Sequence, residues 1–266
     1  MAKKMNKYSQ VMEMIFKEKH SSRMKEVPFT REDIERTALK IGIKNLGDVV
    51  YSFRYRTDLP EYIRSKAPEG MEWVIRPLGK SLYKFSLATA SRIVPNALLV
   101  ETKIPNATPG IISQHALTDE QSLLAIVRYN RLIDIFSGVT CYSMQNHLRT
   151  TVKDIGQMEV DELYVGVDQR GAQYVFPVQA KVGNDKLGVV QIEQDVAMCA
   201  EKFPTLICKP IAAQFMDDNV IALFAIEIGS KGIAVSMESH YRLVSPDEMT
   251  EADFKSYRTR KLTPLI

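Results

Sequence analysis

The sequence has few of the residues that build disulfide frameworks or zinc sites. It contains three cysteines, Cys141, Cys199 and Cys208, and four scattered histidines. An odd number of cysteines argues against a disulfide framework, and their spacing matches no zinc pattern. No pair of histidines has the spacing of a histidine-rich zinc site. We therefore expect the cysteines to be buried, reduced thiols.

Long apolar runs are also absent. Runs such as residues 220–228 are far too short to span a bilayer. The chain begins Met-Ala-Lys-Lys without an apolar signal core, so we expect a cytoplasmic protein without membrane contact. The sequence has no Walker loop, no G-x-G-x-x-G and no G-x-S-x-G elbow. Nothing therefore indicates nucleotide hydrolysis, dinucleotide binding or a serine nucleophile.

What is present is an ordinary globular composition with an uneven distribution of charge. The 266 residues are 25% charged and 45% hydrophobic, which suits one large domain or two smaller ones. Residues 1–90 hold 18 Lys and Arg against 11 Asp and Glu, a balance of +7, whereas residues 91–266 hold 17 against 21, a balance of −4. A basic first third suggests a part that meets a polyanion, with an ordinary charged surface as the alternative.

The first part of the chain begins with helical patterns and then changes to strand patterns. Residues 1–27 form either a short helix or a loose arm, which we treat as an N-terminal arm. Thr30 is a good N-cap for a helix, and helical patterns follow at residues 46–55 and 59–66. Residues 73–76 and 82–87 then resemble two strands around a turn.

Helices followed by a basic-tipped hairpin predict a small winged-helix-like DNA-binding domain over residues 28–94. A dimerisation or scaffold domain of the same shape is the alternative. In a winged helix, cations on the helices and the hairpin contact the DNA backbone. The expected phosphate contacts are Arg54, Arg56, Arg64, Lys80 and Lys84.

Residues 95–117 are rich in proline, show little periodicity and form the best candidate linker, although residues 97–101 could be a short strand. A second domain is expected over residues 118–266. It begins with a strongly apolar helix for which Thr118 is the predicted cap. The following order of strand, strand, helix, strand and strand predicts an α/β fold.

The candidate catalytic residues lie in a predicted hairpin at residues 161–181, whose turn lies near Gly171. Residues equally far from an antiparallel turn face each other, so residue 161 is expected beside residue 180. Gln179 and Lys181 share one face of their strand because side chains alternate. Asp161, Gln179 and Lys181 should therefore converge. A carboxylate and an amide oxygen suit Mg²⁺, and a lysine stabilises negative charge that develops on a phosphate.

This arrangement resembles the PD-(D/E)xK phosphodiesterase superfamily, which includes most Type II restriction endonucleases. The resemblance covers about residues 118–228. It implies a restriction-endonuclease-like central mixed sheet flanked by helices, with Asp161 and Gln179 as ligands of Mg²⁺, or alternatively of Mn²⁺, and Lys181 as the catalytic lysine. Glu120, on the preceding helix, resembles an additional acidic ligand of many members.

The sequence departs from the family pattern at two positions. Val160 stands where the family has proline, and Gln179 replaces the usual acid. Glu159 lies two residues before Asp161 and is expected to compensate as a metal ligand. A QxxxY motif of some branches is half present, because Gln191 is followed by Asp195 rather than by tyrosine.

The stretch at residues 142–150 is rich in hydrogen-bonding groups and precedes the hairpin. Gln145, His147 and Arg149 are candidates for DNA contacts there, with a plain polar loop as the alternative. The combined prediction is a metal-dependent endonuclease for double-stranded DNA, most like a Type II restriction enzyme. The resemblance further implies a homodimer and a cognate DNA methyltransferase. A DNA-binding regulator with an inactive nuclease-like domain, and a repair, junction or RNA nuclease of the same core, are the alternatives.

Overall fold

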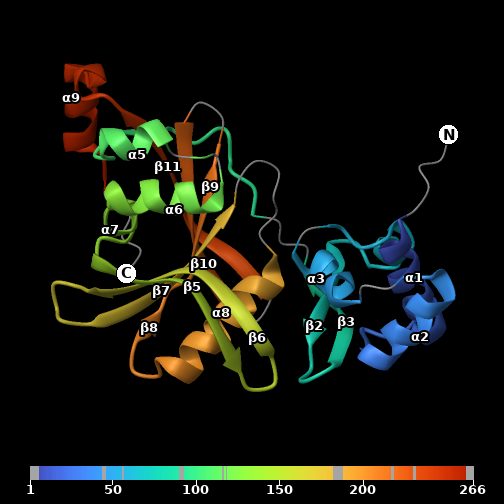
Figure 1. The fold of residues 1–266 in the computed structure, drawn as a ribbon. Coiled ribbons are helices and arrows are strands. Elements are labelled where there is room, and N and C mark those ends of the chain that lie inside the picture. Colours follow the sequence, from blue (N-terminus) through green and yellow to red (C-terminus); the bar gives the residue numbers. More distant parts are fainter. Residues whose placement is uncertain are drawn as a thin grey trace, which may run out of the picture.

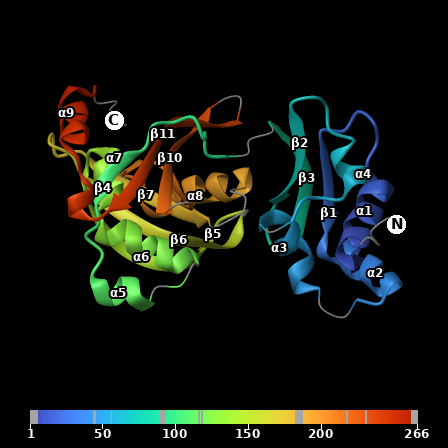
Figure 2. The same ribbon diagram turned by 90° about the horizontal axis from the view of Figure 1, so that it is seen from above.

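The computed structural model describes residues 6–43, 46–55, 57–89, 93–115, 117, 119–181, 188–216, 219–229 and 232–261. Two bodies lie side by side (Figures 1 and 2): an N-terminal module, residues 7–89, and a C-terminal body, residues 102–259. Each contains helices packed on its own sheet, so the chain is a mixed α/β protein. Among the described residues, no helix is both long enough and apolar enough to cross a membrane.

The N-terminal module consists of short helices around a three-stranded antiparallel sheet of order β1-β3-β2. In chain order its elements are α1 (Lys7–Lys19), β1 (Glu26–Thr30), α2 (Arg31–Ile41), α3 (Gly47–Tyr55), α4 (Glu61–Arg64), β2 (Met71–Pro77) and β3 (Leu82–Thr89). The helices and the hairpin expected from the sequence are therefore present, with shifted ends.

The module is held together by an aromatic core that includes α1. Phe16 of α1 packs edge-on against Trp73 and Phe85, and all three side chains are buried. Thr30 caps α2 as predicted: it accepts the Asp33 N–H, and the Asp33 carboxylate accepts the Thr30 N–H at 2.9 Å. The segment before residue 20 is thus a helix built into this core, which excludes the loose arm at residues 7–19.

The C-terminal body is built on a curled mixed sheet of order β4-β11-β10-β9-β7-β6-β5, with β8 beside β7. Neighbours pair antiparallel except β4 with β11, and β7 with β8 and β9, which are parallel. The elements are β4 (Thr102–Pro105), α5 (Gly110–His115), α6 (Glu120–Tyr129), α7 (Leu132–Ser137), β5 (Thr140–Val152), β6 (Gly156–Val167), β7 (Gln173–Lys181), α8 (Val189–Lys202), β8 (Ile207–Cys208), β9 (Ile211–Phe215), β10 (Val220–Gly229), β11 (Gly232–Val244) and α9 (Glu251–Thr259).

The two faces of the sheet have separate cores because side chains alternate along β7. Tyr174, Phe176, Val178 and Ala180 pack in the core beneath α6 and α7. Val175 points the other way, into the core beneath α8. Gln179 and Lys181 therefore belong by alternation to the α8 side of the sheet.

Several segments differ from the sequence prediction. The stretch at residues 142–150 is part of β5, an exposed strand rather than a loop. The proposed linker contains α5 and β4, and β4 lies at Thr102–Pro105 rather than at residues 97–101. The expected long helix is divided into α6 and α7 at Arg131, whose φ is +50°. Thr118, the predicted cap, lies outside the described residues, and Asp119 caps α6 by accepting the Ser122 N–H.

The module and the body are joined at α8. Arg76 of β2 donates two hydrogen bonds of 2.7 Å to the Glu193 carboxylate. This fork is only partly exposed, which strengthens it relative to a surface ion pair. Near the start of α8, a Cβ built on Gly188 would lie 3.4 Å from the carbonyl oxygen of Arg54 in α3. The helix α3 is thereby placed next to the catalytic face predicted from the sequence.

Candidate active site

The site begins with the hairpin formed by β6 and β7. Its turn is closed by Gly171 at φ +83° and by the Asp168 carboxylate, which accepts the N–H groups of Arg170 and Ala172 at 2.8 and 2.9 Å. Glu162 pairs with Val178, so continuation of this register sets Asp161 opposite Gln179, one residue from the predicted partner. Asp168 is therefore a turn residue, as the sequence indicated.

Asp161 lies where the β6–β7 ladder ends. Its Oδ2 accepts the Ala180 N–H at 2.9 Å, so a side chain satisfies a backbone group that has left the ladder. This bond holds the carboxylate against β7 and confirms the predicted contact between residues 161 and 180. The bond also fixes the direction of the carboxylate without using its other oxygen.

Lys181 and Glu120 form the second part of the site. The Lys181 ammonium donates to Glu120 Oε1 at 2.8 Å, and the lysine side chain is only 13% exposed. Glu120 stands in the first turn of α6, on a different helix and 61 residues away in sequence. The acid that the resemblance implied as a metal ligand is therefore paired with the candidate catalytic lysine.

Gln179 is placed differently from the predicted ligand. Its side chain is fully buried and does not line the pocket described below. Its Oε1 accepts a short hydrogen bond from Gln191, and its Nε2 donates to Asp195 Oδ2 at 2.8 Å. Both ends of the amide are thus held by α8, and the carbonyl oxygen reaches the pocket only through Gln191.

Asp195 is the acidic group that the sequence analysis did not use. It is fully buried, burial raises its pKa well above the ordinary value, and its Oδ1 has no hydrogen-bond partner. The hydrogen bond from Gln179 and the charge of Lys181 oppose this rise. The available signal was the four-residue spacing of Gln191 and Asp195, which puts both on one face of α8.

Burial also controls the pKa of Asp161. It raises the pKa of this carboxyl to about 6, against the opposing effects of the Lys181 charge and the Ala180 N–H. The charge of Glu120 contributes to the rise. A carboxyl of this kind resists holding a negative charge unless a cation is nearby. Perturbed carboxyls in a cleft are typical of functional sites.

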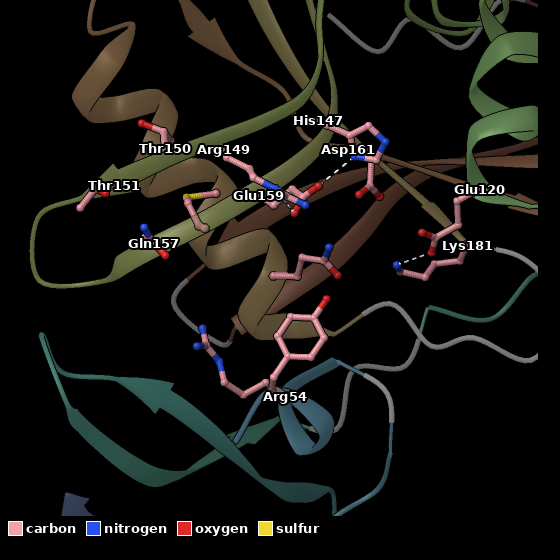
Figure 3. Close-up of a pocket in the computed structure, with 13 residues that line it drawn as sticks. Arg54, Glu120, His147, Arg149, Thr150, Thr151, Gln157, Glu159, Asp161 and Lys181 are labelled. Carbon is pink, nitrogen blue, oxygen red and sulfur yellow. Dashed lines mark hydrogen bonds and ion pairs between the residues drawn. The ribbon is translucent and has the colours of Figure 1, made fainter. Parts of the chain in front are cut away.

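A pocket of about 730 Å³ opens above these groups. Glu120, Asp161, Lys181 and Gln191 line it from the C-terminal body, together with residues of the β5–β6 hairpin. Figure 3 shows Arg54 on the opposite side, on the helix of the N-terminal module. The pocket is therefore walled by both bodies.

The β5–β6 hairpin supplies a polar cluster on this wall. Glu159 binds His147 at 2.8 Å and Arg149 at 3.0 Å. Burial tends to raise the pKa of Glu159, but the hydrogen bonds and charges of His147 and Arg149 outweigh burial and leave the pKa lowered. Glu159 thus lines the same pocket as Asp161 with its charge balanced by its own neighbours, and its role as a compensating metal ligand stays a prediction.

The structure places only some of the predicted DNA-contact residues at the pocket. Arg54, His147 and Arg149 line the pocket. The others are not among its lining residues: Arg64 is paired with Glu61, Lys84 is paired with Glu26, Lys80 lies in the β2–β3 turn, and Gln145 lies on β5. Arg56 lies outside the described residues.

The oxygen groups of the pocket fit a hard cation that keeps much of its water. Asp161 presents one carboxylate oxygen beyond its bond to Ala180, and Glu120 lies beside it on the pocket wall. Mg²⁺ is commonly held by one or two carboxylates plus waters and substrate phosphate. Over the described part of the chain, three or more His, Cys, Asp or Glu side chains nowhere form a ready metal cluster. Asp161 would thus be the main protein ligand, with Gln179 behind it.

Comparisons of the chain with family models, with curated proteins and with solved structures give no match. The functional conclusion therefore depends on the geometry of this site.

Proposed function

We propose that the protein is a Mg²⁺-dependent endonuclease that hydrolyses phosphodiester bonds in DNA, most like a Type II restriction enzyme of the PD-(D/E)xK class. The observation that carries the proposal is the placement of Asp161 and Lys181 on one pocket wall, from the ends of two adjacent antiparallel strands. The helices α6 and α7 precede this hairpin with the strand β5 between them and it, α8 follows the hairpin, and the parallel strand β9 lies beside β7. A mixed sheet with helices on either side of the hairpin supports the proposal.

The residues of the chain have distinct roles in this proposal. Asp161 is held against β7 by the Ala180 N–H and would bind the ion. When bound, Mg²⁺ neutralises phosphate charge and lowers the pKa of a water. Lys181 is positioned by Glu120 and would turn its ammonium toward a phosphoryl oxygen as negative charge develops there. Gln179 keeps the strand end aligned, since Gln191 and Asp195 hold both ends of its amide.

The N-terminal module supports a nucleic-acid substrate. The helices α1, α2 and α3 and the terminal β2–β3 hairpin follow the order expected for a winged helix, with the short helix α4 between α3 and the hairpin. The α3 helix and Arg76 of β2 face the C-terminal body, so the module lies where it would hold a substrate against Lys181. Two copies would be needed to cut both strands of a duplex, and a cognate methyltransferase is expected if the role is restriction.

The experiment is cleavage of mixed-sequence DNA by the purified protein with and without Mg²⁺. We expect Mg²⁺-dependent cleavage by the wild type, and Lys181→Ala should abolish it while the variant still folds and binds DNA. Discrete fragments support a restriction enzyme. Full cleavage by the Lys181→Ala variant would remove the catalytic assignment.

Two candidates compete with restriction, and each is favoured by one observation. The burial of Gln179 and the hydrogen bonds at both of its ends favour a DNA-binding regulator whose nuclease-like site is inactive. Shifted but intact DNA in the same experiment would select this candidate. The second wall that Tyr51 and Arg54 of α3 add to the pocket favours a repair or junction nuclease, for which structure-dependent nicking would be the result.

A further inference from the structure

The pocket has a wall that the catalytic hairpin does not supply. Tyr51 and Arg54, three residues apart on α3, line it opposite Asp161 and Lys181. The wall is fixed in place because the Arg76–Glu193 fork joins β2 to α8 and because α3 approaches Gly188 closely. The N-terminal module therefore forms part of the candidate active site itself.

The dimensions of the pocket limit what enters it. Its volume of about 730 Å³ lies in the range of pockets that bury a drug-sized ligand. A complete duplex, whose major groove alone is ~12 Å wide, is much larger than such a ligand. A short stretch of one strand is closer to this size.

The lining chemistry matches a single strand. Tyr51 is 46% exposed and presents an aromatic ring at the pocket. Arg54 stands one helical turn further along α3, while Arg149 lies on the β5–β6 hairpin with an 80% exposed side chain. Proteins that bind single strands combine an aromatic platform for the bases with cations that follow the backbone. An aromatic ring and two guanidinium groups around one slot provide this combination, although Arg149 also binds Glu159.

We infer that the pocket takes one unpaired nucleic-acid strand, which passes between α3 and the β5–β6 hairpin with a base against Tyr51 and phosphates beside Arg54 and Arg149. The inference rests on the proposed function, because it names the form of the substrate at Asp161 and Lys181. Flaps, single strands and locally opened duplexes all present such a segment. A duplex would place one locally opened strand at Asp161 and Lys181, as the proposed cleavage of duplex DNA requires.

The test measures binding without hydrolysis. The full-length Asp161→Asn protein is titrated, in EDTA, into a labelled DNA strand and into the blunt duplex of the same sequence, with fluorescence anisotropy as the readout. We expect the strand to bind at least about tenfold more tightly than the duplex. Adding Tyr51→Ala should weaken strand binding by about tenfold, and Tyr51→Phe, which keeps the ring, should not. Adding Arg54→Ala should weaken binding and lower its salt dependence by about one phosphate contact.

Matched controls are available far from the pocket. Tyr129→Ala on α6 and Arg258→Ala on α9 remove an exposed tyrosine and an arginine at sites that do not line the pocket, and both should leave strand binding unchanged. A Tyr51→Trp variant gives a second measurement that does not depend on loss of a side chain. Its added fluorescence should be quenched by the strand.

The inference is overturned if the duplex binds as tightly as the strand. It is also overturned if the Tyr51 and Arg54 variants bind like their parent, or if Tyr51→Trp shows no quenching. The proposed function fails separately: strand binding that depends on Tyr51, with no Mg²⁺-dependent cleavage by the wild type, would refute the nuclease and leave the strand pocket standing.

Discussion

The carboxyl of Asp161 makes the site costly to fold when no metal is bound, and this cost can be measured. Burial raises its pKa to about 6 in the folded protein, compared with ~3.9 for an unperturbed aspartate. Between these values the folded state binds more protons than the unfolded state. The free energy of unfolding therefore falls as pH rises from about 4 to about 6, and it stays lowered above pH ~6.

The size of the effect follows from the pKa difference. A shift of about two units corresponds to about 3 kcal/mol at neutral pH, as an upper value for a side chain that is not completely buried. Asparagine has nearly the same shape, does not ionise, and can still accept the Ala180 N–H. We therefore expect Asp161→Asn to stabilise the metal-free protein by about 2–3 kcal/mol near neutral pH, and by almost nothing near pH ~4.

The assay is urea unfolding of both proteins in EDTA at the two pH values. Asp168→Asn is the matched control, since hydrogen bonds from Arg170 above all lower the Asp168 pKa to about 2. Its contribution has the opposite sign: stability is present above the unfolded pKa and is lost as pH falls through the folded pKa. The Asp168 variant should therefore be less stable than the wild type at neutral pH. The reasoning would be refuted if the difference in unfolding free energy between Asp161→Asn and wild type were no larger at neutral pH than at pH ~4.

Further substitutions test two ion pairs and the core of the N-terminal module. Arg128→Leu should destabilise the protein by about 3–5 kcal/mol in urea unfolding, because it leaves the fully buried Glu162 carboxylate without its cation. Arg76→Ala should cost about 1 kcal/mol, and a double-mutant cycle with Glu193→Ala should assign most of that loss to their pair. Phe16→Ala should cost about 3–5 kcal/mol in thermal or urea unfolding, because α1 is built into the core of the N-terminal module; a near-neutral result would make α1 an attached arm after all.

The hairpin could be predicted from the sequence because its causes are local. Alternation placed Gln179 and Lys181 on one face, and Gly171 marked the turn. These features brought residue 161 to residue 180 without knowledge of the rest of the fold. The register differed by one residue because the Asp168 side chain, rather than the symmetry of the turn alone, sets where the strands begin to pair.

The neighbours of the hairpin could not be predicted in the same way. Whether Gln179 meets a cation or α8 depends on how α8 is rotated on the sheet, which is a tertiary effect. The pattern of α8 showed mixed faces, and only packing selects the face with Gln191 and Asp195. The position of Arg54 in the pocket depends in addition on how the N-terminal module contacts the C-terminal body. The periodicity of the sequence carries no information about that contact.

The helix α8 connects the candidate active site with the N-terminal module. Gln191 and Asp195, four residues apart, point from α8 toward β7, while Glu193 stands between them in sequence and therefore on the opposite side of the helix, where it binds Arg76. The helix that holds Gln179 thus also holds the N-terminal module. A loss of the Arg76–Glu193 pair should widen the slot beside Tyr51 without breaking the Lys181–Glu120 contact, because that contact belongs to α6 and β7. In Arg76→Ala, duplex binding should then rise relative to strand binding, and an unchanged ratio would show that the fork does not control the width of the pocket.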